Sequence, residues 1–187
     1  MNILVLTCSG KAGGNTEKLG AAFSQGCTEG GHRAQTIRFS QIEVKPCRGC
    51  NACRVSGRCV QRDGMEEIYQ AFLECDLLAL ATPLYFWGPS AQMKLVIDRL
   101  YALGRDHPKG YFSYPLKKCV LLATAADSQR HFWVFESLQQ YYQRLVAYLR
   151  WTDCGILLAG NCGGTKAPRR IEDTDWLDRA YHLGRRL

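Results

Sequence analysis

The chain has 187 residues, of which 47% are hydrophobic and 22% charged. This composition excludes a disordered chain and a coiled coil, and a domain of this length buries roughly 70% of the surface that its unfolded chain exposes. The 24 basic and 17 acidic residues leave a net charge of +7, but the basic residues are scattered singly or in pairs, which disfavours a nucleic-acid interface. No apolar stretch is long enough to cross a bilayer and no basic residue precedes the first apolar run, so we expect a soluble, cytoplasmic protein.

Strand-like apolar runs alternate with amphipathic helical patterns along the chain. The expected strands cover residues 2–7, 34–39, 76–82, 118–124 and 155–159. The expected helices place these apolar sets on one face each: Leu19, Ala22 and Phe23; Met65, Ile68, Tyr69 and Phe72; Met93, Val96, Ile97 and Leu100; Phe135, Leu138, Tyr142 and Leu145; Trp176, Ala180 and Leu183. Pro89 fits the first turn of the third helix and Gly104 its end.

Strands that alternate with helices in this way predict one doubly wound α/β domain over residues 1–187, with a parallel sheet covered on both faces. In such sheets, ligands bind outside the carboxyl ends of the strands. The loops that follow each strand are therefore the places where functional residues are expected.

The loop after the first strand combines hydroxyl side chains, three glycines and Lys11 directly before a helix. Glycines let backbone N–H groups approach an anion, and the helix dipole favours negative charge there, so the loop predicts a phosphate site. Ala12 after Lys11 excludes an ATPase loop, and the glycines at positions 10, 13 and 14 lack the dinucleotide spacing. The alternative is an ordinary strand-to-helix turn with Asn15 as its cap.

The loop after the third strand contains three consecutive aromatic residues, Tyr85, Phe86 and Trp87. A core that helices already fill cannot take all three, and flat aromatic walls suit a planar ligand. The alternative is a partner interface or a lid over the core. Together with the phosphate loop, the pattern favours a planar ring that carries a phosphate, and a mononucleotide flavin fits that description.

The ten cysteines fall into two groups. Six are dispersed in mostly apolar surroundings and are interpreted as small core residues: Cys8, Cys27, Cys75, Cys119, Cys154 and Cys162. The other four, Cys47, Cys50, Cys53 and Cys59, form a C-x2-C-x2-C-x5-C set that could hold a [4Fe–4S] cluster. Zinc, which usually takes two knuckles across a longer loop, is a further alternative, as is a loop of free thiols or a labile disulfide.

These motifs resemble those of the flavodoxin-like NAD(P)H-dependent FMN reductases. The residues that carry the resemblance are the phosphate loop, the run Pro83-Leu84-Tyr85-Phe86, Lys94 and Asp98-Arg99. The run from Pro46 to Cys53, with Gly57-Arg58-Cys59 and Asp63-Gly64-Met65, is similar to the iron–sulfur flavoprotein branch of that family.

The resemblance implies a flavodoxin-like, three-layer fold with sheet order 2-1-3-4-5, FMN at the strand ends, and a homodimer or homotetramer. By position, it assigns the phosphate to Ser9, Lys11, Gly14, Asn15 and Thr16, and the isoalloxazine ring to Pro83, Leu84, Tyr85, Phe86 and Trp87. The ring's pyrimidine edge would meet Thr124, Ala125, Ala126 and Asp127, a loop without the glycines common in relatives.

We therefore expect an FMN-dependent oxidoreductase that takes hydride from NADH or NADPH and passes electrons to a flavin, a quinone or another small acceptor. The flavin carries the chemistry, so no side chain is expected to be a catalytic acid or base, and none of the four histidines (His32, His107, His131 and His182) belongs to a recognisable triad. The cysteine-rich loop at 46–60 follows the second strand, which places a cluster beside the flavin. Alternatives are an iron–sulfur flavoprotein that relays single electrons from a ferredoxin-like donor, and a non-catalytic redox or metal sensor.

Overall fold

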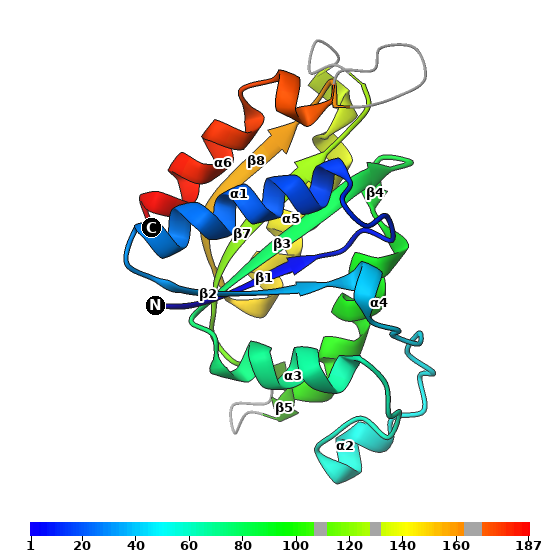
Figure 1. The fold of residues 1–187 in the computed structure, drawn as a ribbon. Helices are drawn as coiled ribbons and strands as arrows, with labels where there is room; N and C mark the ends of the chain where they lie inside the picture. Colours follow the sequence, from blue (N-terminus) through cyan, green and yellow to red (C-terminus); the bar gives the residue numbers. More distant parts are fainter. Residues whose placement is uncertain (107–111, 128–131, 163–169) are drawn as a thin grey trace.

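The computed structural model describes residues 1–106, 112–127, 132–162 and 170–187 (Figure 1). At its centre is a parallel sheet with the spatial order β2-β1-β3-β7-β8. These strands are β1 (Asn2–Thr7), β2 (Arg33–Arg38), β3 (Leu77–Tyr85), β7 (Lys118–Thr124) and β8 (Thr152–Ala159). Numbered along the chain, the parallel strands stand in the order 2-1-3-4-5, which confirms the expected flavodoxin-like sheet.

Two short antiparallel pairs add detail that the sequence did not predict. β4 (Gly88–Pro89) folds back on the end of β3, and β5 (Arg105–Asp106) pairs with β6 (Phe112–Ser113) in a separate sheet. Pro89 therefore lies in a strand, and the expectation that it opens a helix was wrong. The helix starts at Ala91, because the Ser90 side chain caps it.

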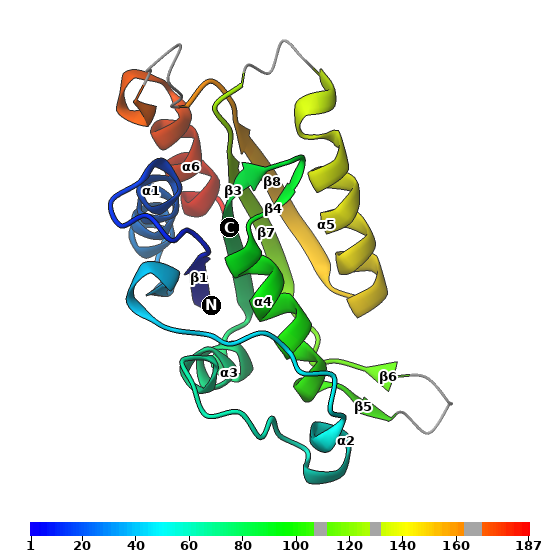
Figure 2. The ribbon, with the colours of Figure 1, turned by 90° about the vertical axis from the view of Figure 1, so that its right-hand side faces the viewer.

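The helices cover both faces of the sheet (Figure 2). One face carries α1 (Asn15–Glu29) and α6 (Trp176–Arg185), and the other carries α3 (Met65–Glu74), α4 (Ala91–Arg99) and α5 (Glu136–Leu149). A 3-10 turn at Leu100–Leu103 continues α4 up to Gly104, as expected for the end of that helix. The short helix α2 (Ala52–Ser56) stands away from the sheet within the cysteine-rich loop (Figure 2).

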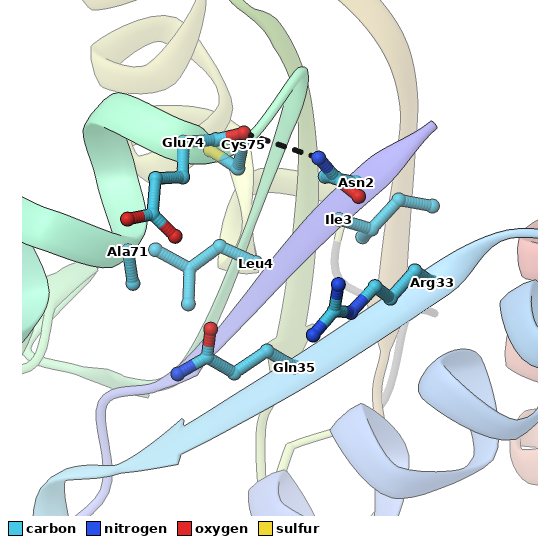
Figure 3. Close-up of a pocket in the computed structure, with 8 residues that line it drawn as sticks. All are labelled: Asn2, Ile3, Leu4, Arg33, Gln35, Ala71, Glu74 and Cys75. Atoms are coloured by element: carbon cyan, nitrogen blue, oxygen red, sulfur yellow. Dashed lines mark hydrogen bonds between the residues drawn. The ribbon is translucent and has the colours of Figure 1, made fainter.

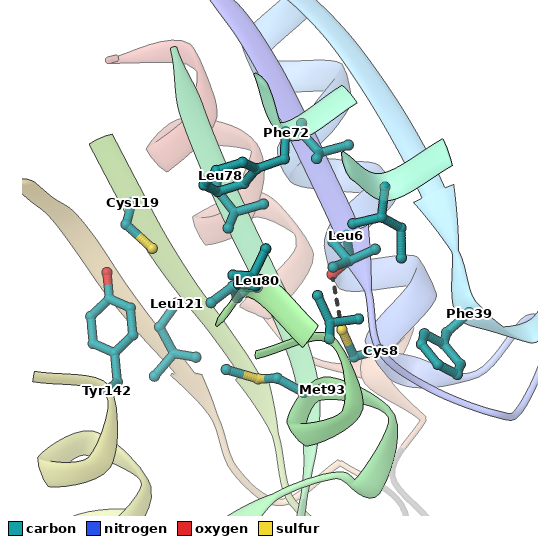
Figure 4. Close-up of a cluster of buried hydrophobic side chains, with 14 of the residues drawn as sticks. Leu6, Cys8, Phe39, Phe72, Leu78, Leu80, Met93, Cys119, Leu121 and Tyr142 are labelled. Carbon is teal, nitrogen blue, oxygen red and sulfur yellow. Dashed lines mark hydrogen bonds between the residues drawn. The ribbon is translucent and has the colours of Figure 1, made fainter. Parts of the chain in front are cut away.

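Alternation along the strands divides the apolar side chains between two cores. In β1, Leu4 and Leu6 face α3–α5, whereas Ile3 and Val5 face α1 and α6, and all four are at most 2% exposed. Figure 4 shows the first core, which Tyr142 of α5 enters from the side opposite the strands. Helices and strands thus fill both faces, and the carboxyl edge of the sheet is left to the loops.

Some predicted boundaries differ from the structure. β3 continues past Thr82 to Tyr85, and β8 begins at Thr152 rather than at residue 155, because polar residues at its start hid the strand pattern. Of the dispersed cysteines, five are buried as predicted: Cys8, Cys27, Cys75, Cys119 and Cys162. Cys154 is only partly buried, since β8 is the edge strand of the sheet.

Candidate functional site

The loop between β1 and α1 lies at the carboxyl edge of the sheet and folds into a closed turn. The Ser9 hydroxyl is buried and accepts a hydrogen bond from the Lys11 backbone N–H at 3.2 Å. The Gly14 N–H donates to the Lys11 carbonyl at 3.3 Å, and a Cβ at Gly14 would lie 3.2 Å from that oxygen. This close approach explains the glycine at position 14. The Lys11 side chain is exposed, on the outside of the loop.

Helix α1 begins at this loop with no side-chain cap. Gly14 occupies the cap position, and its backbone is extended. The Asn15 side chain does not cap the helix, because its amide donates to the Cys162 carbonyl at 3.0 Å, so the interpretation of Asn15 as a cap was wrong. The first N–H groups of an α-helix have no acceptor within the helix, and the dipole makes that end positive. An uncapped helix start at this edge suits an anion.

Glu17, in the first turn of α1, shapes the loop and was missed by the sequence analysis. Its side chain accepts a hydrogen bond from the Gly13 backbone N–H at 2.9 Å and another from the Ser40 hydroxyl. It thereby ties the loop to the segment that follows β2. An acidic residue in the first turn of a helix ordinarily indicates only a favourable interaction with the dipole, so no sequence signal points to this role.

Two of the predicted site loops contact each other, and the loop after β8 lies against one of them. The Thr16 and Thr124 hydroxyls, both buried, are 2.8 Å apart and join the start of α1 to the end of β7. The Ala125 N–H donates to the Ala159 carbonyl, and the Asp127 carbonyl accepts from Asn161 at 2.6 Å, so the loops after β7 and β8 lie side by side. Ala126 and Asp127 are exposed.

The aromatic segment is a hairpin rather than an irregular loop. Pro83, Leu84 and Tyr85 end β3, and Phe86 and Trp87 form the two-residue turn into β4. Both turn residues have positive φ, 47° and 61°. Such turns usually contain asparagine or glycine, because bulky residues rarely adopt these angles. The Phe86 side chain is 95% exposed and Tyr85 and Trp87 about half. The strained turn thus holds the aromatic rings outside the core.

A further aromatic residue, Trp133, joins this hairpin from the other side of the site. It lies in the 3-10 turn Phe132–Val134 before α5, and its ring is 6.0 Å from that of Trp87, centroid to centroid. Both rings are partly exposed, at 43% and 49%. The pair could not be predicted from the sequence, because Trp87 and Trp133 are 46 positions apart and come together only in the folded chain.

Ser90 connects the hairpin to the phosphate loop and was also missed. Its hydroxyl donates to the Cys8 carbonyl at 2.6 Å and accepts from the Met93 N–H at 3.2 Å, while its own N–H donates to the Thr82 hydroxyl at 3.0 Å. Ser90 is fully buried. One residue, through its side chain and its backbone N–H, therefore caps α4 and fixes the two neighbouring strand ends relative to each other.

The four clustered cysteines, Cys47, Cys50, Cys53 and Cys59, line a single cavity of about 360 Å³. Asp98 and Tyr101 contribute to its wall. Burial raises the pKa of the Cys53 thiol, and negative charge on any of the other three thiols raises it further. Across the described residues, no three cysteine, histidine, aspartate or glutamate side chains converge tightly enough to hold one metal ion.

The cysteine cavity lies away from the phosphate loop, toward the other end of α4. Its wall includes Tyr101, just past the carboxyl end of α4, whereas Ser90 at the amino end of α4 contacts that loop. The helical rise between these two residues amounts to about 16 Å. The cysteine loop follows β2, as predicted, but then runs along α4 away from the edge of the sheet (Figure 2).

A second, small cavity lies at the opposite, amino edge of the sheet (Figure 3). It measures about 100 Å³, and its lining includes Asn2 and Arg33, the first residues of β1 and β2. It is too small for a nucleotide. The two described histidines add no site, since His32 contacts the amino terminus and His182 is exposed; His107 and His131 lie outside the described residues.

Among the helices of the described residues, none combines the length and the apolar composition that a membrane span needs.

The family model of the NADPH-dependent FMN reductases matches residues 1–149. An iron–sulfur flavoprotein of Methanocaldococcus jannaschii is 28% identical over 100% of this chain and 95% of its own. One of Methanosarcina thermophila is 36% identical over 57% of this chain and 56% of its own.

Solved structures show the same fold. An NAD(P)H:quinone oxidoreductase from Methanothermobacter marburgensis superposes with a TM-score of 0.76 at 17% identity, over 99% of this chain and 96% of its own. An FMN-dependent NADH-azoreductase from Bacillus anthracis, solved in complex with FMN, superposes with a TM-score of 0.69 at 14% identity, over 99% of this chain and 96% of its own.

Proposed function

Since this chain belongs to the NADPH-dependent FMN reductase family and is an NAD(P)H-dependent flavoprotein oxidoreductase, we propose that FMN binds between the β1–α1 loop, the β3–β4 hairpin and the loop after β7. The phosphate lies against Ser9, Lys11, Gly14, Asn15 and Thr16. The ring lies against the hairpin residues Pro83, Leu84, Tyr85, Phe86 and Trp87, with its pyrimidine edge toward Thr124, Ala125, Ala126 and Asp127.

The uncapped start of α1 carries this proposal. Its N–H groups, the exposed Lys11 ammonium and the Thr16 hydroxyl offer donors and positive charge for one phosphate group. The described loops contain one such cradle, and the dinucleotide spacing is absent from the sequence, which favours FMN over FAD. The partly exposed rings of Tyr85 and Trp87 provide apolar faces of the size that a planar ring system needs.

When bound, FMN supplies the redox chemistry, accepting a hydride from NADH or NADPH and giving electrons to an acceptor. The chain's own residues bind and orient it. Glu17 and Ser90 hold the phosphate loop and the hairpin in fixed positions. Trp87 and Trp133 leave open faces that suit a flat acceptor such as a flavin or a quinone.

The test is an anaerobic preparation of the full chain. We expect the released pigment to be FMN, and we expect NADH or NADPH to bleach the bound flavin. Lys11→Ala should weaken FMN binding in a salt-dependent manner, because Lys11 is exposed. Lys18→Ala, which removes the nearby lysine paired with Glu172, is the matched control. Mainly FAD in the extract, or equal affinities in both variants, would contradict the assignment.

The cysteine cavity supports a second centre, which we propose to be a [4Fe–4S] cluster on Cys47, Cys50, Cys53 and Cys59. Four thiols around one cavity, not closed on a single point, suit a cubane of several atoms better than one zinc ion. With a cluster, the protein would relay single electrons from a ferredoxin-like donor. Without one, the loop would be a redox-sensing element.

Iron and acid-labile sulfide, assayed per chain beside a Cys50→Ala variant, test the cluster. Cys154→Ala, which alters a partly buried cysteine outside the cavity, is the control. We expect iron and sulfide in the wild type and in the control, and little in Cys50→Ala. Iron near zero in the wild type with flavin reduction intact would overturn the proposed cluster.

We also propose that residues 1–187 form a single FMN-binding domain and that the protein is a homodimer or homotetramer. Sedimentation measurements will test the oligomeric state.

A further inference from the structure

The segment that carries the four clustered cysteines is not held by hydrophobic packing. Val44 and Met65, which flank it, are buried, but no hydrophobic residue between them is. Its regular structure is limited to α2, and Val55 on that helix is 93% exposed. Four thiols can nevertheless share one cavity only if the ends of the segment are fixed. The fixing interaction must therefore be polar.

That interaction is a buried ion pair at the base of the segment. Arg99, the last residue of α4, is 2% exposed and has the largest fully buried side chain of the described residues. Its Nη1 donates to Asp63 Oδ2 at 2.8 Å and its Nη2 donates to Asp63 Oδ1 at 3.2 Å. The two side chains are 1% and 3% exposed. A two-pronged contact of this kind fixes the orientation of both groups.

The same pair joins the two ends of the segment. Lys45, at its start, donates its backbone N–H to Asp63 Oδ2 at 2.9 Å and accepts from Arg99 Nη1 at its carbonyl at 2.8 Å. Asp63, at its end, also accepts from the Met65 N–H at 3.0 Å. The Tyr69 hydroxyl donates to the Arg99 carbonyl at 2.6 Å, which ties the pair to α3. The segment is thus a loop closed at its base on two helices.

We propose that Arg99 and Asp63 are positioning residues that hold the cysteine segment closed, so that its four thiols surround one cavity before any metal arrives. Neither residue is a ligand. The metal arm of this proposal rests on the cluster proposed above, whereas the loop closure itself does not. Buried charges that bond to each other and to backbone groups are costly to separate, and this makes the closure firm.

Electrostatics supports the assignment. Burial works to lower the pKa of Arg99, but the hydrogen bond with Asp63 outweighs it and raises that pKa. Arg99 therefore stays charged close to Cys59. A fixed positive charge at that place offsets part of the negative charge of a thiolate-ligated centre.

The test compares Asp63→Asn and Arg99→Lys with Glu66→Gln. The control makes the same carboxylate-to-amide change as the first variant, in the exposed Arg62–Glu66 pair one helical turn away. Two readouts are taken on the full chain: iron, sulfide and FMN per chain after anaerobic preparation, and tryptic cleavage of the metal-free protein. Trypsin has several basic residues to attack within the segment, among them Arg48, Arg54 and Arg58.

We expect Asp63→Asn and Arg99→Lys each to lower the iron and sulfide per chain about tenfold, as loss of supporting hydrogen bonds around metal ligands does. FMN per chain stays unchanged, because the flavin loops lie at the other end of α4. Cleavage within 45–62 accelerates about tenfold, since proteolysis follows the open population. Glu66→Gln matches the wild type. Unchanged iron and cleavage would overturn the proposal, as would parallel loss of iron and FMN with cleavage along the whole chain. If the wild type takes up no iron, the proposed cluster is refuted. The rates of tryptic cleavage alone then show whether Arg99 and Asp63 hold the segment closed.

Discussion

Replacing Thr16 by valine tests the proposed phosphate cradle. The Thr16 hydroxyl is buried and lies 2.8 Å from the Thr124 hydroxyl. A hydroxyl has one donor and two acceptor positions. Thr124 can therefore donate to Thr16 while Thr16 donates to the phosphate. Thr16→Val removes both interactions but keeps the shape of the side chain.

Two separate losses follow from this geometry. A hydrogen bond to a charged group contributes about 1.5–3 kcal/mol, which corresponds to FMN binding weaker by about 10-fold to 150-fold. The Thr124 hydroxyl also loses its partner in the buried interior, at a cost of about 1–3 kcal/mol in the free energy of unfolding. The double variant Thr16→Val/Thr124→Val leaves no orphaned hydroxyl, so it should recover much of the stability but none of the FMN affinity.

The assay titrates the apoprotein with FMN and follows flavin fluorescence, while urea denaturation reports stability. Thr28→Val is the control, because Thr28 is an exposed threonine at the far end of the same helix. It should leave the FMN dissociation constant within about twofold, since the Thr28 hydroxyl donates to the Ser24 carbonyl of the same helix. Wild-type affinity in the double variant would refute the placement of the phosphate at Thr16, whatever happened to stability.

Gly26→Ala should destabilise the fold by about 1–3 kcal/mol, although alanine is the better helix former, because a Cβ there would lie 2.0 Å from a backbone oxygen of α6; an unchanged urea midpoint would contradict this. Burial works to raise the pKa of Asp63, but hydrogen bonds from Arg99 and the backbone hold that pKa below its usual range. The ionised Asp63 carboxylate therefore stabilises the fold above its unfolded pKa of about 3.9, and this contribution is lost as the pH falls through the lower folded pKa. The difference in unfolding free energy between wild type and Asp63→Asn should accordingly shrink below about pH 4. A constant difference from neutral to acid pH would be incompatible with the ion pair. Trp87→Leu and Trp133→Leu should each raise the KM for menadione, a planar quinone, about 2-fold to 12-fold, because this is the range that aromatic stacking energies give. If steady-state kinetics show an unchanged KM in both variants, the two tryptophans do not contact the acceptor.

The sheet could be predicted because its strands are continuous apolar runs, which are typical of parallel strands covered on both faces. In the structure, β1 pairs in parallel with β2 on one side and with β3 on the other. The hairpin after β3 could not be predicted in this way. Pro83 and the aromatic run resemble a loop, and Phe86 and Trp87 give no turn signal, because their left-handed angles are imposed by the antiparallel pairing of β3 with β4.

The candidate site shows the same division. The loops at strand ends could be located from chain order, since strand order fixes which loops share an edge. The residues that hold those loops in place could not. Ser90 is not singled out by the sequence, because Pro89 is expected in the first turn of the helix, and Asp63 and Arg99 stand out only as residues that carry the family resemblance. Their roles depend on contacts between positions far apart in the chain, such as Ser90 with Cys8 and Asp63 with Arg99.

The left-handed turn at Phe86 and Trp87 has a consequence for how this protein can evolve or be engineered. Each residue held in such a conformation costs on the order of 1–3 kcal/mol. Asn-Gly at these positions would relieve that cost, so selection for thermostability alone will drift toward it and discard both rings. Phe86 and Trp87 are therefore retained only if selection also acts on binding of the ligand that their rings contact. A library that is screened first for heat resistance and then for turnover would make that trade-off visible at two adjacent codons.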